Sequence, residues 1–232
     1  MTTPSHKEQP ISFASKMFGI APLPVRTLGG LGFVLLAIFA PIGHLSQDLF
    51  AGVLGPHFGG EVLWWVLTLG LFAYVRLVER RSWSSIGLCR PTRTDVALAV
   101  IAGVLMVAGI MVIYNVIFPA LHLAINMKHA QALMRTSFTY RLLLVARAAV
   151  AEETLFRGYP IERLLESRFG RVLAGLIPWA AFTYAHLADW GAAQLIVAGY
   201  GGLILTVLYL WRRNLWINML AHFIADGSGF LT

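Results

Sequence analysis

The chain has 232 residues, of which 58% are hydrophobic and only 12% charged, and its net charge is +7. A soluble domain carries about 25% charged residues, so this chain has too little polar surface to face water on all sides. The positive charge does not indicate nucleic-acid binding, because the basic residues lie between apolar runs and not in a stripe with interleaved aromatic residues.

The first 27 residues mix polar and apolar side chains before the first long apolar run begins near Leu28. They contain no convincing cleavable signal peptide. Residues 11–20 alternate enough to indicate a segment on the membrane surface, with a disordered tail as the alternative. We therefore predict a cytoplasmic or interfacial segment over 1–27 and a single membrane domain over 28–232, without internal repeats.

The rest of the chain consists of apolar runs separated by polar connections. A membrane-spanning helix needs roughly 20 apolar residues, and several runs are shorter, so some helices are expected to tilt, extend or re-enter. No period-two alternation indicates a barrel. We predict an all-α polytopic transmembrane bundle of about seven helices, in a range of about six to eight, with short loops. The predicted spans are 28–46, 61–78, 96–120, 142–156, 172–187, 192–211 and 215–230.

The distribution of arginines predicts the orientation, because loops rich in Lys and Arg stay on the cytoplasmic side. Residues 47–60 contain no Lys or Arg, whereas 79–93 and 157–171 contain four arginines each, and Arg212-Arg213 follow the sixth span. These positions agree on a cytoplasmic N-terminus and an outer C-terminus, in what we expect to be a bacterial inner membrane. The three basic residues within 121–141 disagree and are outnumbered.

Five ionisable side chains interrupt the apolar runs in the second half of the chain. An ionisable group in hydrocarbon is costly unless it is paired or hydrated, so such residues indicate a functional site by default. Carboxylates and imidazoles together are suited to proton transfer. The five residues are Glu152, Glu153, His186, His222 and Asp226.

The adjacent glutamates need different partners, because neighbouring residues on a helix point about 100° apart. Glu153 and Arg157 are four residues apart and are expected to pair along one face, which leaves Glu152 facing elsewhere. The alternative is that both glutamates are interfacial residues of a short helix, neutralised by Arg147 and Arg157. Charge spacing alone leaves both interpretations open.

The two histidines differ in their surroundings. His186 closes an apolar run one turn after Phe182, and a single membrane histidine of this kind is more often a packing residue than a catalyst. His222 lies between Asn218 and Asp226 at intervals of four residues, which forms one polar stripe on an otherwise apolar helix. Three polar residues on one face of an apolar helix favour a water-filled cavity and a functional role over simple packing.

These groups suit the hydrolysis of an amide. A carboxylate beside an imidazole can take a proton from attacking water, and a second imidazole with a hydrogen-bonding side chain can stabilise the oxyanion. No G-x-S-x-G elbow and no H-E-x-x-H helix are present, and the single Cys89 has no nearby imidazole in the sequence. We expect no cofactor. The alternative is a divalent metal such as zinc, bound by Glu152, His186 and His222 if their helices converge.

Three motifs in this order resemble those of the CAAX prenyl protease and bacteriocin-processing family, the Abi-type intramembrane peptidases related to type II CAAX prenyl endopeptidases. They are Glu152-Glu153-x-x-x-Arg157, Phe182-x-x-x-His186 and His222-x-x-x-Asp226. Phe156-Arg157-Gly158 and Ile86-Gly87-Leu88 are also similar to the family. The resemblance covers about residues 80–230, the expected protease-like core. Each motif is short, and the ordered set of three is fairly specific.

The resemblance implies a multi-helix peptidase with a cavity open to the cytosol. By this analogy Glu152 and His186 activate the water, Arg157 holds the glutamate pair, and His222 forms the oxyanion site with residue 226. The prenyl endopeptidases carry Asn at that last position, and this chain has Asp226. An ionised Asp226 would repel an oxyanion, so we expect it to be protonated, to orient His222, or to bind a metal.

Depth in the membrane sets a condition on this site. Glu152 lies only about five residues from Arg157, whereas His186 lies 15 residues from Arg171, over about 20 Å along a helix. The two side chains meet only if the fifth helix begins inside the cytosol or the fourth continues past Arg157. We expect the fourth helix to continue, with Arg157 partly buried.

The prediction is therefore a glutamate-dependent membrane endopeptidase. Its expected partners are membrane lipid and a peptide or membrane-anchored protein substrate, with no nucleic acid, and the sequence does not indicate its oligomeric state. Cleavage of small membrane peptides or anchors, or protection against bacteriocins, is favoured over processing of CAAX tails. One alternative is a proton-coupled transporter, although this sequence lacks the pair of broken helices in two matching halves that such a fold would have. The other alternative is a non-catalytic immunity or scaffold protein.

Overall fold

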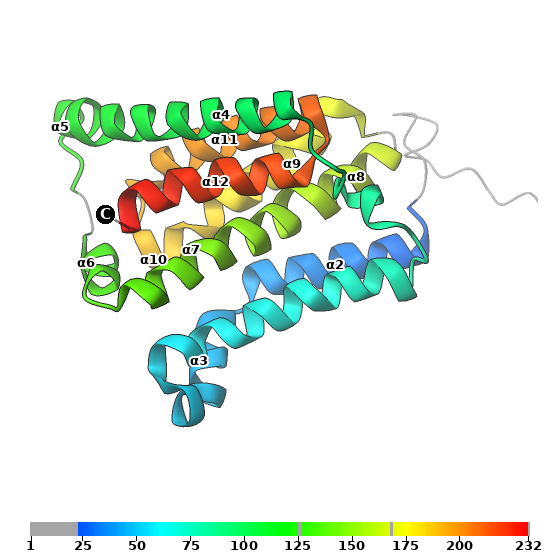
Figure 1. The fold of residues 1–232 in the computed structure, drawn as a ribbon, viewed down its shortest axis with the longest axis horizontal. Helices are drawn as coiled ribbons and strands as arrows, with labels where there is room; N and C mark the ends of the chain where they lie inside the picture. Colours follow the sequence, from blue (N-terminus) through cyan, green and yellow to red (C-terminus); the bar gives the residue numbers. More distant parts are fainter. Residues whose placement is uncertain (1–22, 125–126, 168, 232) are drawn as a thin grey trace, which may run out of the picture.

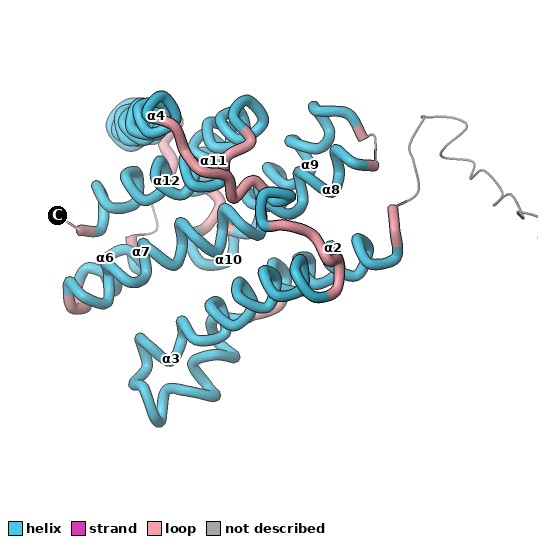
Figure 2. Tube along the Cα trace, turned by 45° about the vertical axis from the view of Figure 1, so that its right-hand side comes forward, coloured by secondary structure: helices cyan, strands magenta, loops and turns pink. Residues whose placement is uncertain are grey.

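The computed structural model describes residues 23–124, 127–167 and 169–231, and within these ranges all regular structure is helical (Figure 2). The predicted all-α class is confirmed. Residues 1–22 of the predicted N-terminal segment, including the expected membrane-surface segment at 11–20, lie outside the described residues. Most of the helices run along one common direction and form a single elongated bundle (Figure 1).

The helices follow the predicted apolar runs closely, with short or π-helical pieces between longer ones. In chain order they are α2 (Val25–Phe39), α3 (Ile42–Leu77), the 3₁₀ helix η1 (Trp83–Ile86), α4 (Arg93–Val112), the π-helix η2 (Ile113–Ile117), α5 (Phe118–Ala120), α6 (Lys128–Met134), α7 (Phe138–Glu153), the π-helix η3 (Thr154–Gly158), α8 (Tyr159–Glu166), α9 (Gly170–Ala185), α10 (Leu187–Trp190), α11 (Gln194–Arg212) and α12 (Leu215–Phe230).

Three helical stretches of the described chain are long and apolar enough to cross a membrane, namely 57–77, 93–120 and 194–212. A fourth is counted if the bent pair α2 and the first part of α3 form one span. The helices α9 and α12 have 16 residues each and fall short of a full bilayer crossing.

The predicted span 28–46 is wrong as one continuous helix, because it is divided at Pro41. Ala40 is extended, with ψ 148°, and the axes on either side are bent by 73°. A residue before proline is disfavoured in the helical region, and proline has no N–H to donate. A second break in α3 lies at Gly55, whose φ of 79° suits glycine alone.

The fourth predicted helix continues past Arg157, as the depth argument required. The helices α7, η3 and α8 follow one another without a gap to Glu166, and Arg157 is fully buried. Glu152 is thus fourteen residues from the end of α8, about 21 Å along a helix, which matches the distance of His186 from the start of α9. A π-helical turn directly after Glu153 is a feature often found at functional sites.

The helix α12 lies in the interior of the bundle and packs against α4 and α7, while α11 packs against α9 and α4 (Figure 1). Small residues such as Ala99, Ala221 and Ala225 form the contact between α4 and α12 together with Leu205 of α11. Small side chains let membrane helices approach closely. Many large apolar side chains point outward instead, for example Leu36, Val104, Val172 and Val207, all of which are exposed. An apolar exterior around a polar interior is the pattern expected in lipid.

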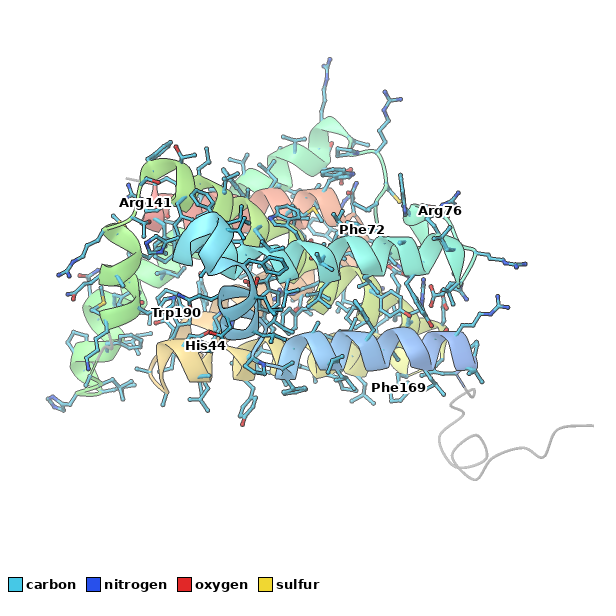
Figure 3. All side chains as sticks on the ribbon, turned by 90° about the horizontal axis from the view of Figure 1, so that it is seen from below. His44, Phe72, Arg76, Arg141, Phe169 and Trp190 are labelled. Carbon is cyan, nitrogen blue, oxygen red and sulfur yellow. The ribbon has the colours of Figure 1, made fainter. Side chains whose placement is uncertain are left out.

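The arginine-rich connections gather at one end of the bundle. Four ion pairs join them there: Arg81 with Glu166, Arg163 with Glu79, Arg213 with Glu162 and Arg212 with Asp95. Figure 3 shows Arg76 and Phe169 toward this end, and His44, Arg141 and Trp190 toward the other. The clustering agrees with the charge pattern on which the predicted orientation depends.

Candidate active site

Glu153 lies at the centre of a buried polar cluster between α7, η3 and α12. Its carboxylate is fully buried and accepts three hydrogen bonds: from Nη1 of Arg157 at 2.9 Å, from Nδ1 of His222 at 2.8 Å and from Nδ2 of Asn218 at 3.0 Å. The predicted pairing of Glu153 with Arg157 is confirmed. A buried carboxylate with three donors, two of them from α12, fixes α12 against the end of α7.

Arg157 is buried against α11 and α9. Its Nη2 donates to the carbonyl oxygen of Gly202 at 3.2 Å, and its guanidinium lies 4.1 Å above the ring of Phe182. A Cβ atom on Gly202 would come within 2.8 Å of the Phe182 ring and 3.2 Å of Nη2. Glycine at this position therefore makes the room in which Arg157 reaches the backbone of α11.

His222 uses its two ring nitrogens differently. Because the Glu153 carboxylate accepts, Nδ1 carries the hydrogen of that bond. Nε2 faces the opposite way, 3.4 Å from Oδ2 of Asp226 and 3.9 Å from Oε2 of Glu152. Asn218 and His222 reach the same carboxylate, so the polar residues predicted on one face of α12 do lie on one face.

Glu152 faces away from Glu153 and is 19% exposed. Its Oε1 lies 3.5 Å from Nη1 of Arg147, and its Oε2 lies 3.9 Å from Nε2 of His222. The second distance is too long for a direct hydrogen bond, and polar groups at such a separation are commonly bridged by water. The adjacent glutamates thus pair with different arginines, as their spacing predicts, and lie on opposite nitrogens of the one His222 ring.

The alternative interpretation, neutralisation by Arg147 and Arg157, is also present in the structure, since both ion pairs form. It does not account for the hydrogen bond from His222 to Glu153 or for the full burial of Glu153. Neutralisation by Arg157 requires no further donors, yet Glu153 also accepts hydrogen bonds from the His222 imidazole and the Asn218 amide, which are 65 or more residues away in sequence.

His186 lies at the C-terminal end of α9, beside Phe182. Its Nδ1 donates to the carbonyl oxygen of Phe182 at 2.8 Å, which leaves Nε2 as an acceptor in the neutral ring. The Phe182 ring lies 4.5 Å from the His186 ring and 6.4 Å from the His222 ring. Within the described residues, His186 forms no ion pair with Glu152, and the two imidazoles share Phe182 as a neighbour.

Four residues of this region were not among the predicted site residues: Asn218, Phe182, Arg147 and Glu61. Asn218 was visible as part of the polar stripe. Glu61 had a signal too, because it is an ionisable residue at the start of an apolar run, and it accepts a hydrogen bond from Arg147 at 2.6 Å. Phe182 was visible in the Phe182-x-x-x-His186 motif, but its contact with Arg157 depends on helix packing.

The described part of the chain contains no group of three His, Cys, Asp or Glu side chains arranged to hold a metal ion. The alternative set of Glu152, His186 and His222 is included in that finding. Zinc would need three such donors converging at about 2.0–2.3 Å around one point.

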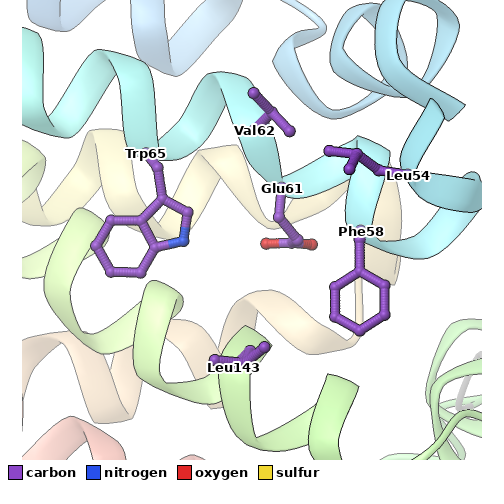
Figure 4. Close-up of a pocket in the computed structure, with 6 residues that line it drawn as sticks. All are labelled: Leu54, Phe58, Glu61, Val62, Trp65 and Leu143. Atoms are coloured by element: carbon purple, nitrogen blue, oxygen red, sulfur yellow. The ribbon is translucent and has the colours of Figure 1, made fainter.

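A cavity of about 360 Å³ lies between α3 and α7, on the side of the bundle that carries Glu61 (Figure 4). Its walls are mostly apolar, and Glu61 is the ionisable residue in them. Figure 4 shows the Glu61 carboxylate between Trp65 and Phe58, with Leu143 of α7 across from it. The lining residues are Leu54, Phe58, Glu61, Val62, Trp65 and Leu143.

Residues 134–228 match the family model of the type II CAAX prenyl endopeptidase Rce1-like proteins. The resemblance seen in the motifs is confirmed over this stretch, which we call the Rce1-like segment. An uncharacterized protein of Bacillus subtilis (strain 168), YpbD, is 34% identical over 92 residues, which are 40% of this chain and 44% of YpbD. No solved structure matches the chain.

The Rce1-like segment is shorter than the predicted protease-like core of 80–230. It runs from the last residue of α6 into α12 and contains all six predicted site residues. Ile86-Gly87-Leu88 and Glu61 lie before it. The chain spans less than half of the curated relative that it matches. The membrane-span helices and the Rce1-like segment together identify an integral membrane protein that contains a segment similar to the type II CAAX prenyl endopeptidases.

Proposed function

We propose that the chain is an intramembrane endopeptidase in which Glu152 and His186 activate water and His222 contributes to the oxyanion site. One observation carries the proposal: Glu153 holds Nδ1 of His222, so that Nε2 is directed toward Glu152 and Asp226. An imidazole oriented by a buried carboxylate, with a second carboxylate near its free nitrogen, is the arrangement that acid–base hydrolysis needs.

The two glutamates have separate tasks in this proposal. Both oxygens of Glu153 accept hydrogen bonds from protein donors and the side chain is fully buried, so it orients His222 and Asn218. Glu152 is partly exposed, and no hydrogen bond from another described residue reaches its Oε2, so it is available to a water molecule. We assign the general base to Glu152 for that reason.

The reaction is proposed in two steps. A water molecule between Glu152 and His186 gives its proton to Glu152 while its oxygen attacks the peptide carbonyl carbon. The oxyanion that forms accepts a hydrogen bond from Nε2 of a His222 ring that carries hydrogen on both nitrogens. The C–N bond then breaks, and Glu152 returns the proton to the leaving amine. No atom of the protein is covalently changed.

The substrate class proposed is a peptide or a membrane-anchored protein cleaved at or within the bilayer. Small membrane peptides or anchors, or bacteriocin-like peptides, are preferred over prenylated tails. The proposed orientation places the arginine-rich end in the cytoplasm and the C-terminus outside, in a bacterial inner membrane. The four ion pairs at that end and its arginine content support this orientation.

The test is cleavage of quenched fluorescent peptide libraries by purified full-length protein in detergent. Glu152→Ala and His186→Ala should each lower the rate by about 100-fold or more, the range expected for loss of a general base. His129→Ala, an exposed histidine of α6 that packs on Trp190, is the matched control and should retain the wild-type rate.

Two other outcomes would replace the proposal. Proton flux in sealed vesicles without any peptide cleavage supports a transporter. Protection or scaffolding that survives both substitutions supports a non-catalytic role. Intact folding of each variant is checked by thermal unfolding in the same detergent, so that a loss of rate is not confused with a loss of structure.

A further inference from the structure

Glu152 has a charged neighbour whose own position is set by a helix outside the Rce1-like segment. Nε of Arg147 donates to Oε2 of Glu61 at 2.6 Å, and Nη1 of the same side chain lies 3.5 Å from Oε1 of Glu152. Tyr140 donates to the other oxygen of Glu61 at 3.1 Å. The three charged side chains are between 12% and 19% exposed, so none of these contacts is strongly screened by solvent.

We propose that Arg147, held in place by Glu61, is the positioning residue that turns Glu152 toward the reacting water. This inference rests on the proposed function, because it assigns a partner to the proposed general base. Glu61 belongs to α3, 86 residues away from Arg147 in sequence, so the proposal makes the N-terminal half of the chain part of the site.

The geometry of the guanidinium explains how one contact sets the other. The group is planar, with its donors in a fixed fork, so a short bond at Nε fixes the direction of Nη1. Its central carbon Cζ lies 5.4 Å from the centroid of the Trp64 ring, so the guanidinium also contacts an aromatic side chain of α3. With Oε1 of Glu152 facing Nη1, the other oxygen, Oε2, is the one that faces Nε2 of His222.

Glu61 itself is not a candidate for the general base. Both of its oxygens already accept hydrogen bonds, one from Arg147 and one from Tyr140. Its place in the wall of the cavity between α3 and α7 therefore does not make it available for proton transfer. Its function in this arrangement is to hold Arg147.

A second buried Glu–Arg pair provides a matched comparison. Arg163 of α8 donates from Nε and Nη2 to both oxygens of Glu79, the second residue after α3. Like the Glu61–Arg147 pair, it ties the α3 region to the long α7–α8 helix. Its guanidinium does not contact Glu152, so it serves the fold without touching the proposed base.

The experiment compares five single variants, Glu152→Gln among them, and one double variant of the full-length protein in detergent, with kcat, KM and thermal unfolding measured for each. Glu61→Gln and Arg147→Met should lower kcat roughly 10- to 100-fold, the cost of a misplaced catalytic group, with KM changed by less than about twofold. Arg147→Lys should retain more activity than Arg147→Met, because it keeps the charge but loses the fork. Glu79→Gln should alter thermal stability but leave kcat near the wild-type value.

The decisive variant is the double substitution E61M/R147M. Replacing a buried ion pair with apolar side chains of similar size often leaves stability unchanged, so this protein should fold. If the pair only fastens α3 to α7, its kcat returns to the wild-type value and the inference is overturned. If the pair positions Glu152, kcat stays as low as in Arg147→Met.

The same data separate this inference from the proposed function. A wild-type protein that cleaves nothing, or a Glu152→Gln variant as active as the wild type, overturns both. A wild type that cleaves, an inactive Glu152→Gln and a fully active E61M/R147M overturn the positioning role alone.

Discussion

Nδ1 of His222 lies 2.8 Å from Oε1 of Glu153, and the two residues are 69 positions apart on helices α12 and α7. The bond sets the direction of the imidazole, because a carboxylate can only accept and the hydrogen must be on Nδ1. The free nitrogen then faces Glu152 and Asp226. A buried glutamate that orients a histidine beside a second, accessible glutamate is the relationship from which the following predictions are drawn.

Substitution of the two adjacent glutamates should have different effects on stability. Glu153→Gln leaves the buried Arg157 without its charge partner, which we expect to destabilise the protein by about 3–5 kcal/mol. Glu152→Gln affects a side chain that is 19% exposed and whose ion pair is as long as 3.5 Å, so it should cost less stability than Glu153→Gln while abolishing cleavage. Unfolding in detergent and peptide cleavage, measured side by side, check both. Equal stability of the two variants would contradict the assigned tasks.

Gly202 should tolerate no larger residue. An added methyl group would meet the Phe182 ring at 2.8 Å and Nη2 of Arg157 at 3.2 Å. Gly202→Ala should therefore displace Arg157, destabilise the protein by about 1–3 kcal/mol and lower activity. Gly199→Ala, three residues earlier on the same helix, is the control, because its methyl group finds its nearest neighbour at an ordinary 3.6 Å. Comparable thermal unfolding of the two alanine variants would show that the close approach at Gly202 is unimportant.

Asp226 should be replaceable by asparagine but not by leucine. Its Oδ2 lies 3.4 Å from Nε2 of His222, and an asparagine there keeps a polar group and adds a donor for the oxyanion. We expect Asp226→Asn to stay within about tenfold of the wild-type rate, and Asp226→Leu to lose about 100-fold. The measurement is kcat on one peptide for all three proteins. A loss in Asp226→Asn as large as in Asp226→Leu would mean that the negative charge itself is required.

Removal of divalent metals should leave peptide cleavage intact. The proposed reaction uses carboxylates and imidazoles, and the described residues offer no three-donor metal site. Wild-type protein dialysed against a chelator should therefore keep its rate, and added zinc should not raise it. A loss of rate that zinc restores would instead support metal-assisted hydrolysis, with Glu152, His186 and His222 as the first candidate ligands to substitute.

The proposed orientation can be read from Cys89, the one cysteine of the chain, which is half-buried in the arginine-rich end. A membrane-impermeant maleimide should label it in inverted vesicles and not in intact cells. As a control, C89S/L121C carries its thiol on an exposed position after α5, at the other end of α4, and should show the opposite pattern. Labelling of Cys89 in intact cells would instead support the opposite orientation, with the arginine-rich end outside.

The sequence alone was enough for the fold class and for the residues of the polar cluster. The apolar composition indicated a membrane protein. The four-residue spacing placed Glu153 and Arg157 on one face of their helix, and it did the same for Asn218, His222 and Asp226. These features are local, because a helix of known period fixes the angle between its own side chains. The ordered motifs then pointed to the Rce1-like segment.

Which glutamate meets which partner was decided by the tertiary structure. The spacing could not distinguish Glu152 from Glu153 as the neighbour of His222, nor show that Arg157 would be fully buried between α9 and α11. The link from Glu61 through Arg147 to Glu152 had no local signature at all. The rotation of one helix against another is set by the packing of side chains far apart in the sequence, and helical period carries no information about it.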